Sequence, residues 1–177
     1  YNRALLSSII EANGFDAALA WAEGLVSNLA RSPRGNDRSQ IKAIFAGECE
    51  IAIINHYYYG KLINSNNSDE QNWAKSVDIL IPNQGKSDRG AHINISGGGI
   101  AKHSKNRREA EQLLEFLVSI EAQKLYAEIN YEYPVIETIA LPSVLDKWGK
   151  FKEDDLPIEK LAESYYEAQM IIDKVGW

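Results

Sequence analysis

Three consecutive tyrosines, Tyr57, Tyr58 and Tyr59, are the residues whose chemistry stands out first. A free phenol has a pKa of about 10, so it is almost fully protonated at neutral pH. A strongly charged metal ion reverses this balance because it favours the deprotonated ligand. Ferric iron is the natural partner of anionic oxygen, and tyrosinate ligation of iron is known from haem proteins. The cluster therefore has the chemistry of a site for a hard cation.

The backbone conformation decides where these three phenols point. In a helix, successive side chains diverge by about 100°, so the three rings cannot all enter one core. In an extended segment, Tyr57 and Tyr59 share one face and Tyr58 takes the other. At least one phenol then meets a cleft or solvent in either case. Aromatic side chains mostly supply buried area, and the residue types alone favour plain packing, so both interpretations stay open at this point.

The tyrosines follow a short apolar run, Ile51–Ile54, which is bounded by polar residues and predicts a buried strand. In open α/β sheets, ligands bind at the carboxyl ends of the strands. This is where the tyrosines would stand. Two further strands are predicted at 77–81 and 91–95, the latter from its alternation of apolar and polar residues.

Apolar residues at steps of three and four predict helices around these strands. They recur from Phe15 to Leu29, and Asp37 with Gln40 resembles a capping box that opens the next helix. Residues 64–72 are polar and are predicted to form a loop. Further helices are predicted at 106–117, 121–129 and 158–172. Strands that alternate with helices are typical of an α/β fold.

The composition is that of an ordinary globular domain of 177 residues. Its formal net charge of -6 argues against nucleic-acid binding and gives no polybasic attraction to a membrane surface. Cys49 is the single cysteine, so no intrachain disulfide can form. Because the sequence begins with tyrosine, we expect a processed or excised portion of something longer.

The sequence offers no arrangement typical of an enzyme. His56 precedes the three tyrosines, and we expect it to hydrogen-bond structurally, since adjacent side chains point in different directions. Gly97–Gly99 lacks the spacing of a phosphate-binding loop. No nucleophile stands beside a base in the pattern of a hydrolase or transferase. A binding function is therefore predicted over a catalytic one.

Several blocks together carry a family resemblance that extends along essentially the whole chain. They are Tyr1–Ser8, Gly35–Ile41 followed by Ala46–Glu48, Ile53–Gly60, His92–Gly97 and Asn130–Val135. In order and spacing these blocks resemble the C-terminal portion of periplasmic ferric-iron-binding proteins, the receptors of ABC importers, and of the cyanobacterial type in particular.

The resemblance implies a type II periplasmic-binding-protein fold, an α/β Venus flytrap, present here only in part. Residues 1–177 would be the C-terminal portion of a two-lobe protein. Within it, 1–88 and 139–177 would form the second lobe, and 89–138 would return to the first.

The resemblance also implies a ligand set for Fe(III). Tyr57 and Tyr58 match the family's adjacent ligand pair, and Tyr1 matches an upstream ligand tyrosine. Asn36 and Asn55 fall near positions that hold a synergistic anion, whereas Tyr59 lies outside the pair and is expected to pack or hydrogen-bond. Family members are longer, and their first lobe supplies further ligands, so this chain would hold half a site.

The implied partners are the membrane permease of an iron ABC importer and the missing N-terminal lobe. A periplasmic monomer is expected, with membrane anchoring as an option. Alternative interpretations are a binding protein for a polyamine, thiamine or phosphonate, and a fragment whose incomplete site stays empty.

Overall fold

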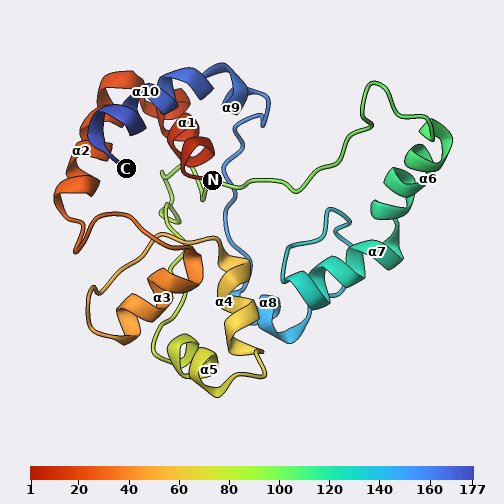
Figure 1. Ribbon diagram of the computed structural model, residues 1–177, viewed down its shortest axis with the longest axis horizontal. Helices are drawn as coiled ribbons and strands as arrows, with labels where there is room; N and C mark the ends of the chain where they lie inside the picture. The colour runs from red at the N-terminus through yellow and green to blue at the C-terminus, as the bar shows by residue number, and fades with distance from the viewer. The chain divides into compact units, whose positions relative to one another are not determined.

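The computed structural model describes residues 1–177, and its regular structure is helical (Figure 1). The helices of the first half of the chain are α1 (Asn2–Asn13), α2 (Phe15–Ser27), α3 (Asp37–Phe45), α4 (His56–Ile63) and α5 (Ser68–Lys75). Those of the second half are α6 (Arg107–Leu117), α7 (Ile120–Leu125), the π-helix η1 (Tyr126–Asn130), α8 (Ser143–Trp148), α9 (Lys160–Glu163) and α10 (Tyr165–Val175).

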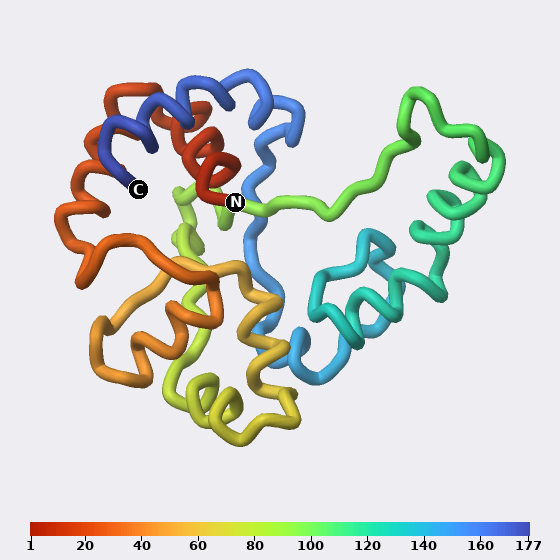
Figure 2. The backbone as a smooth tube through the Cα atoms, viewed as in Figure 1, coloured from red at the N-terminus to blue at the C-terminus, as the bar shows by residue number.

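The chain divides into two compact units, and its path through them can be followed in Figure 2. Unit 1 contains residues 1–34, 81–95 and 151–177, and unit 2 contains residues 35–80 and 96–150. These boundaries describe compactness within this chain. The predicted lobes, 1–88 with 139–177 and 89–138, are a separate division and stay a prediction.

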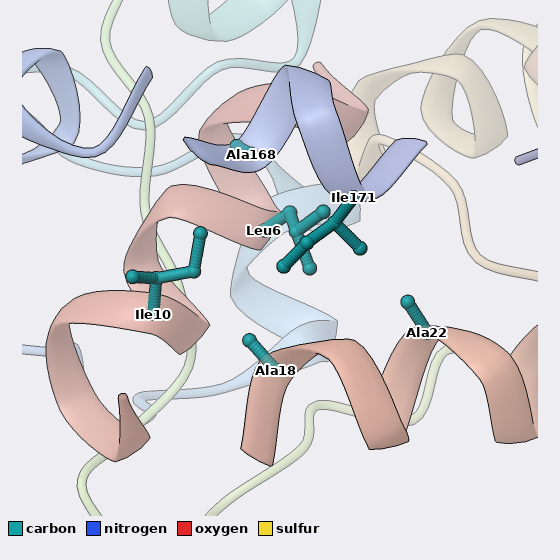
Figure 3. Packing of buried hydrophobic residues seen from close by; sticks show 6 residues of the cluster. All are labelled: Leu6, Ile10, Ala18, Ala22, Ala168 and Ile171. Atoms are coloured by element: carbon teal, nitrogen blue, oxygen red, sulfur yellow. The ribbon is translucent and has the colours of Figure 1, made fainter. Parts of the chain in front are cut away.

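The core of unit 1 is formed by α1, α2 and α10 (Figure 3). Leu6 of α1 and Ile171 of α10 are fully buried, and their side chains point toward each other. Small residues on the facing helices leave room for them; these are Ala18, Ala22 and Ala168. Gly14, with φ 84°, separates α1 from α2, as the sequence predicted. Its left-handed backbone lets the second helix fold back onto the first.

Two adjacent serines of α1 are fully buried and differ in their hydrogen bonding. The Ser8 hydroxyl donates to the Leu5 carbonyl at 2.7 Å and accepts from Nη2 of Arg89 at 3.2 Å. The same guanidinium donates to the Ser8 carbonyl oxygen at 2.9 Å and pairs with Asp154 at 2.6 Å. The Ser7 hydroxyl has no hydrogen-bond partner.

We expect Ser7→Ala and Ser8→Ala to change stability in opposite directions. The first removes a buried, unpaired hydroxyl and should raise the free energy of unfolding by about 1 kcal/mol. The second removes an acceptor from a charged donor and should lower it by about 1–3 kcal/mol. Urea unfolding of both variants measures the difference, and equal effects of the two changes would contradict this assignment.

Unit 2 has its own hydrophobic core, formed by residues of α3, α4 and α5. Ile41, Tyr59, Leu62 and Ala74 form it, with Trp148 packed against the cluster. Leu62 and Ala74 are fully buried. Tyr59 and Leu62 stand three positions apart on α4, so the same face of this helix turns inward. The residues of the first turn, Tyr57 and Tyr58, are less deeply buried.

The predicted strands at 51–54, 77–81 and 91–95 are not strands in this structure. The only β pairing is a single parallel bridge between Ala91 and Glu153. Burial was predicted for 51–54, but Ile51 is 84% exposed and only Ile54 of its isoleucines packs against the core of unit 2. An extended run becomes a strand only where a neighbouring backbone pairs with it. The apolar pattern indicates the run but not the neighbour.

Several helix predictions also need correction. The predicted loop at 64–72 contains the start of α5, whose N-cap Asn67 accepts a hydrogen bond from the Asp69 amide at 2.9 Å. The predicted capping box lies one residue earlier, on Asn36 and Ser39. The predicted helix 121–129 is divided between α7 and η1. The last helix is interrupted at Ser164, between α9 and α10.

Candidate metal-binding site

The adjacent tyrosines stand on the first turn of α4, a short helix that begins at His56. The ring centroids of Tyr57 and Tyr58 lie 4.4 Å apart, with 34° between the ring planes. The Lys61 ammonium, one turn further along, lies 5.2 Å from the Tyr57 ring centroid. Although successive helical side chains diverge, the two rings come together. The structure therefore places two phenols and one cation on the same helix.

Tyr59 differs from its two neighbours because it faces the core. Its hydroxyl donates to the Val77 carbonyl at 3.5 Å, and its ring lies 5.9 Å from that of Trp148. Burial raises the pKa of Tyr59, and the nearby Asp78 carboxylate adds to this. Its phenol thus stays protonated at neutral pH. The prediction that Tyr59 packs or hydrogen-bonds is confirmed.

His56, at the start of α4, is hydrogen-bonded to the segment that follows η1. Its Nε2 lies 2.9 Å from the Tyr131 carbonyl oxygen. Its ring also lies 5.5 Å from that of Tyr133 and 5.4 Å from that of Trp148. Burial lowers the pKa of His56, and the Tyr131 carbonyl and the Glu132 carboxylate oppose this change. The predicted structural hydrogen bond of His56 is confirmed.

The lowered pKa of His56 predicts acid sensitivity. A histidine with a folded-state pKa below its unfolded value of 6.5 binds protons more readily when unfolded. Its contribution to stability is present above pH 6.5 and is lost as the pH falls toward the folded-state pKa. Burial lowers the pKa of His92 in the same direction. We therefore expect the free energy of unfolding to fall between about pH 7 and pH 5.

The matched variant is His56→Gln, which keeps a hydrogen-bonding side chain but does not titrate. Its unfolding free energy should depend less on pH over this range, with the remaining slope carried by His92 and other groups. Thermal unfolding at several pH values measures the slopes. An unchanged slope would show that His56 does not carry the effect.

Both asparagines predicted to bind an anion form hydrogen bonds with residues at the N-terminus of α3. The Asn36 side chain accepts a hydrogen bond from the Ser39 amide at 3.1 Å and caps the helix. The backbone amide and side chain of Asn55 donate to Oδ1 of Asp37 at 2.7 and 3.1 Å. These contacts give both residues a structural role. Their anion-binding role stays a prediction.

Tyr1 belongs to the other compact unit, where it precedes α1 and is 69% exposed. Its carbonyl oxygen accepts from the Leu5 amide at 3.1 Å, as the residue before a helix does. The predicted role of Tyr1 as a third ligand stays a prediction. The structure contains no group of three or more His, Cys, Asp or Glu side chains that could hold a metal ion.

One residue of the surroundings received no role in the sequence-based predictions. Tyr131 lies within Asn130–Val135, one of the blocks that carry the family resemblance. Its backbone is left-handed, with φ 58°. Its ring packs on Gly60 of α4. A signal for this contact does exist in the sequence, because a glycine in the interior of a helix is unfavourable and often has a packing reason.

A family model described as bacterial extracellular solute-binding protein matches residues 6–153. The chain belongs to this family. No helix of the solute-binding chain has the length and apolar character needed to cross a membrane.

Among curated relatives, iron uptake protein A1 of Synechocystis sp. is 41% identical over 177 residues, which are 100% of this chain and 49% of the relative. Iron uptake protein A2 of the same organism is 40% identical over 177 residues, 51% of its length. The solute-binding chain thus spans about half the length of the curated relatives it matches. The predicted resemblance to cyanobacterial-type iron-binding proteins is confirmed.

Solved structures show the same relationship. The ferric-binding protein from Campylobacter jejuni superimposes with a TM-score of 0.94 at 44% identity, covering 98% of this chain and 54% of that one. A Trichodesmium protein in complex with iron and citrate ligands gives 0.92 at 43% identity, covering 100% and 55%. These likenesses confirm the predicted type II periplasmic-binding-protein fold, held here in part. The unpaired extended segments do not alter that assignment, since backbone path and strand pairing are separate properties.

Proposed function

We propose that this solute-binding chain captures Fe(III) for an iron ABC importer and that the phenolates of Tyr57 and Tyr58 are ligands of the ion. The observation that carries the proposal is the close tyrosine pair, with ring centroids 4.4 Å apart and 34° between the ring planes, at the start of α4. The 41% identity of this chain to an iron uptake protein also supports the proposal. Two adjacent phenols supply hard anionic oxygens, which ferric iron prefers.

Metal binding through phenols requires the loss of a proton from each of them. The charge of the ion favours the deprotonated form, so binding releases protons and becomes tighter as the pH rises. The buried Tyr59, whose pKa is raised, takes no part.

The remainder of the coordination shell is proposed from the resemblance. Tyr1 would supply a third phenolate, and Asn36 and Asn55 would hold a synergistic anion next to the metal. Citrate is one candidate anion, since it accompanies iron in the complex of the Trichodesmium protein. Further ligands would come from a first lobe, because this chain spans about half the length of its relatives.

An exposed apolar surface on α6, α7 and η1 supports this first-lobe proposal. α6 has no buried residue in this chain. Leu113, Phe116, Ile120 and Ile129 are each more than 40% exposed. Exposed apolar patches of this kind mark interaction sites. We assign the surface to contact with the first lobe, as the predicted return of 89–138 to that lobe requires.

The proposed partner of the complete protein is the permease of the importer, and the proposed location is the periplasm, where the protein acts as a monomer. The role is binding and delivery, with no chemical turnover. Closure of a two-lobe protein around its ligand would then be the conformational change that the permease recognises.

Equilibrium dialysis against Fe(III) held by a weak chelator tests the proposed ligand class. The proposal predicts retention of iron, tighter at pH 8 than at pH 6, with no competition from spermidine, thiamine or a phosphonate. Competition by one of those compounds without any effect of iron would favour the organic-ligand alternative. Binding of neither would indicate an incomplete site that stays empty.

A further inference from the structure

We propose that Tyr131 is a positioning residue, which fixes the first turn of α4 and thereby the orientation of the Tyr57–Tyr58 pair. Its relevance to iron rests on the proposed function, whereas its effect on the two rings does not. Three observations carry the inference: a hydrogen bond before the pair, a close ring contact after the pair, and a strained backbone at Tyr131 itself.

The hydrogen bond lies immediately before the pair. His56 is the first residue of α4, and its Nε2 is 2.9 Å from the Tyr131 carbonyl oxygen. The imidazole also packs against the rings of Tyr133 and Trp148, whose centroids lie 5.5 and 5.4 Å from its own, and these contacts restrict its movement. Because the next residue is Tyr57, the hydrogen bond sets the direction in which the helix starts.

The ring contact lies just after the pair. A Cβ atom built on Gly60 would stand 2.6 Å from Cγ and 2.8 Å from Cβ of Tyr131. Real Cβ atoms do not approach other atoms so closely, so the Tyr131 ring rests directly on the backbone of α4. Gly60 follows Tyr57 by three positions and therefore lies one turn along the same face. Glycine is needed here for the close approach.

The backbone of Tyr131 is strained. Its φ of 58° lies in the left-handed region, which a bulky residue rarely adopts. Such a conformation persists only where the surrounding structure holds it. Here two hydrogen bonds hold the segment that follows Tyr131: Ser96 donates to the Glu132 carboxylate at 2.7 Å, and the Val135 amide donates to Oε1 of Gln123 at 2.9 Å.

A short helix needs such contacts to hold its orientation. α4 has 8 residues and no side-chain hydrogen bond at its N-cap, and a helix of this length is marginal by itself. If the register of the helix shifted by one residue, each side chain would turn by about 100° around the helix axis. Contacts of Tyr131 on either side of the pair prevent that shift.

Three variants separate the ring from the backbone. Tyr131→Phe keeps both and is the matched control. Tyr131→Gly keeps the left-handed backbone at no steric cost and removes the ring. Tyr131→Asn also tolerates this backbone and serves if the glycine variant unfolds. Gly60→Ala tests the same contact from the other side, since its added methyl group displaces the ring.

The readout is the ¹³C ring resonances of Tyr57 and Tyr58 in the metal-free chain, assigned with single Tyr→Phe variants. Tyr131→Gly and Gly60→Ala should shift both sets of resonances, while Tyr131→Phe should leave them in place. In iron-loaded protein, the same two variants should release Fe(III) about 10- to 100-fold faster, as changes in residues that orient ligands do. Tyr131→Phe should stay within about twofold of the original rate.

Unchanged ring resonances in folded Tyr131→Gly or Tyr131→Asn would overturn the positioning role. Unchanged iron release in a variant whose ring resonances have shifted would overturn the role of Tyr131 at the iron site. If the original chain binds no iron, the proposed function fails, and the metal-free resonances still decide whether Tyr131 positions the pair.

Discussion

Changing both Tyr57 and Tyr58 to phenylalanine is expected to abolish tight Fe(III) binding while the chain stays folded. Each change removes one phenolate oxygen and leaves the ring in place. Even residues that only orient metal ligands cost about 10- to 100-fold in affinity when changed, so the loss of two ligands should exceed about 100-fold. Competition with a chelator of known affinity, followed by the retained iron, measures the change.

Tyr59→Phe is the matched control for this double variant. It makes the same chemical change at the next position, where the hydroxyl faces the Val77 carbonyl at 3.5 Å. The affinity for iron should stay close to that of the original chain, and stability should fall slightly. Retention of iron by the double variant to within a few-fold would mean that the pair is not a ligand.

Gly90→Ala is expected to cause the largest loss of stability of any single change considered. A Cβ atom on Gly90 would lie 2.4 Å from the Glu153 carbonyl oxygen and 2.8 Å from the Asp154 nitrogen. Both are backbone atoms next to the Ala91–Glu153 bridge, so neither can move aside cheaply. Gly90 also has φ 102°. Clash and strain together should cost at least about 3 kcal/mol.

Gly47→Ala isolates the contribution of backbone strain. Gly47 has φ 75°, and no atom lies within 4 Å of the position its Cβ would take. This change should therefore cost only the left-handed conformation, about 1–2 kcal/mol. Urea unfolding of both variants compares the two costs. Equal losses would show that the contact of Gly90 with Glu153 contributes little.

Local signals in the sequence predicted much of the helical structure. Gly14 separates α1 from α2 as expected, and the apolar spacing from Phe15 onward indicates the face that packs in unit 1. The hydrogen bond expected of His56 followed from side-chain directions, whereas the packing and hydrogen bonding of Tyr59 were implied by the resemblance, and both are confirmed. Such expectations rest on periodicity and backbone preferences among residues a few positions apart, although the partners of Tyr59 and His56 lie 18 and 75 positions away.

The failures concern partners that are distant in the sequence. The apolar runs at 51–54 and 77–81 gave no information on the backbone beside them, and they are not paired as strands. α5 is mostly polar, so its periodicity was weak, and only the Asn67 cap marked its start. Tyr131 meets His56 across 75 positions, and its ring needs a missing side chain at Gly60. Such contacts depend on the assembled fold.

The most direct test of the proposed iron capture is a visible absorption spectrum recorded as Fe(III) is added with a weak chelator. Coordination by tyrosine phenolates predicts a broad charge-transfer band that grows to one equivalent of iron. The band should weaken in Tyr58→Phe and vanish when both residues of the pair are changed. A chain that retains iron without such a band, or with a band that survives both changes, would contradict iron capture by Tyr57 and Tyr58.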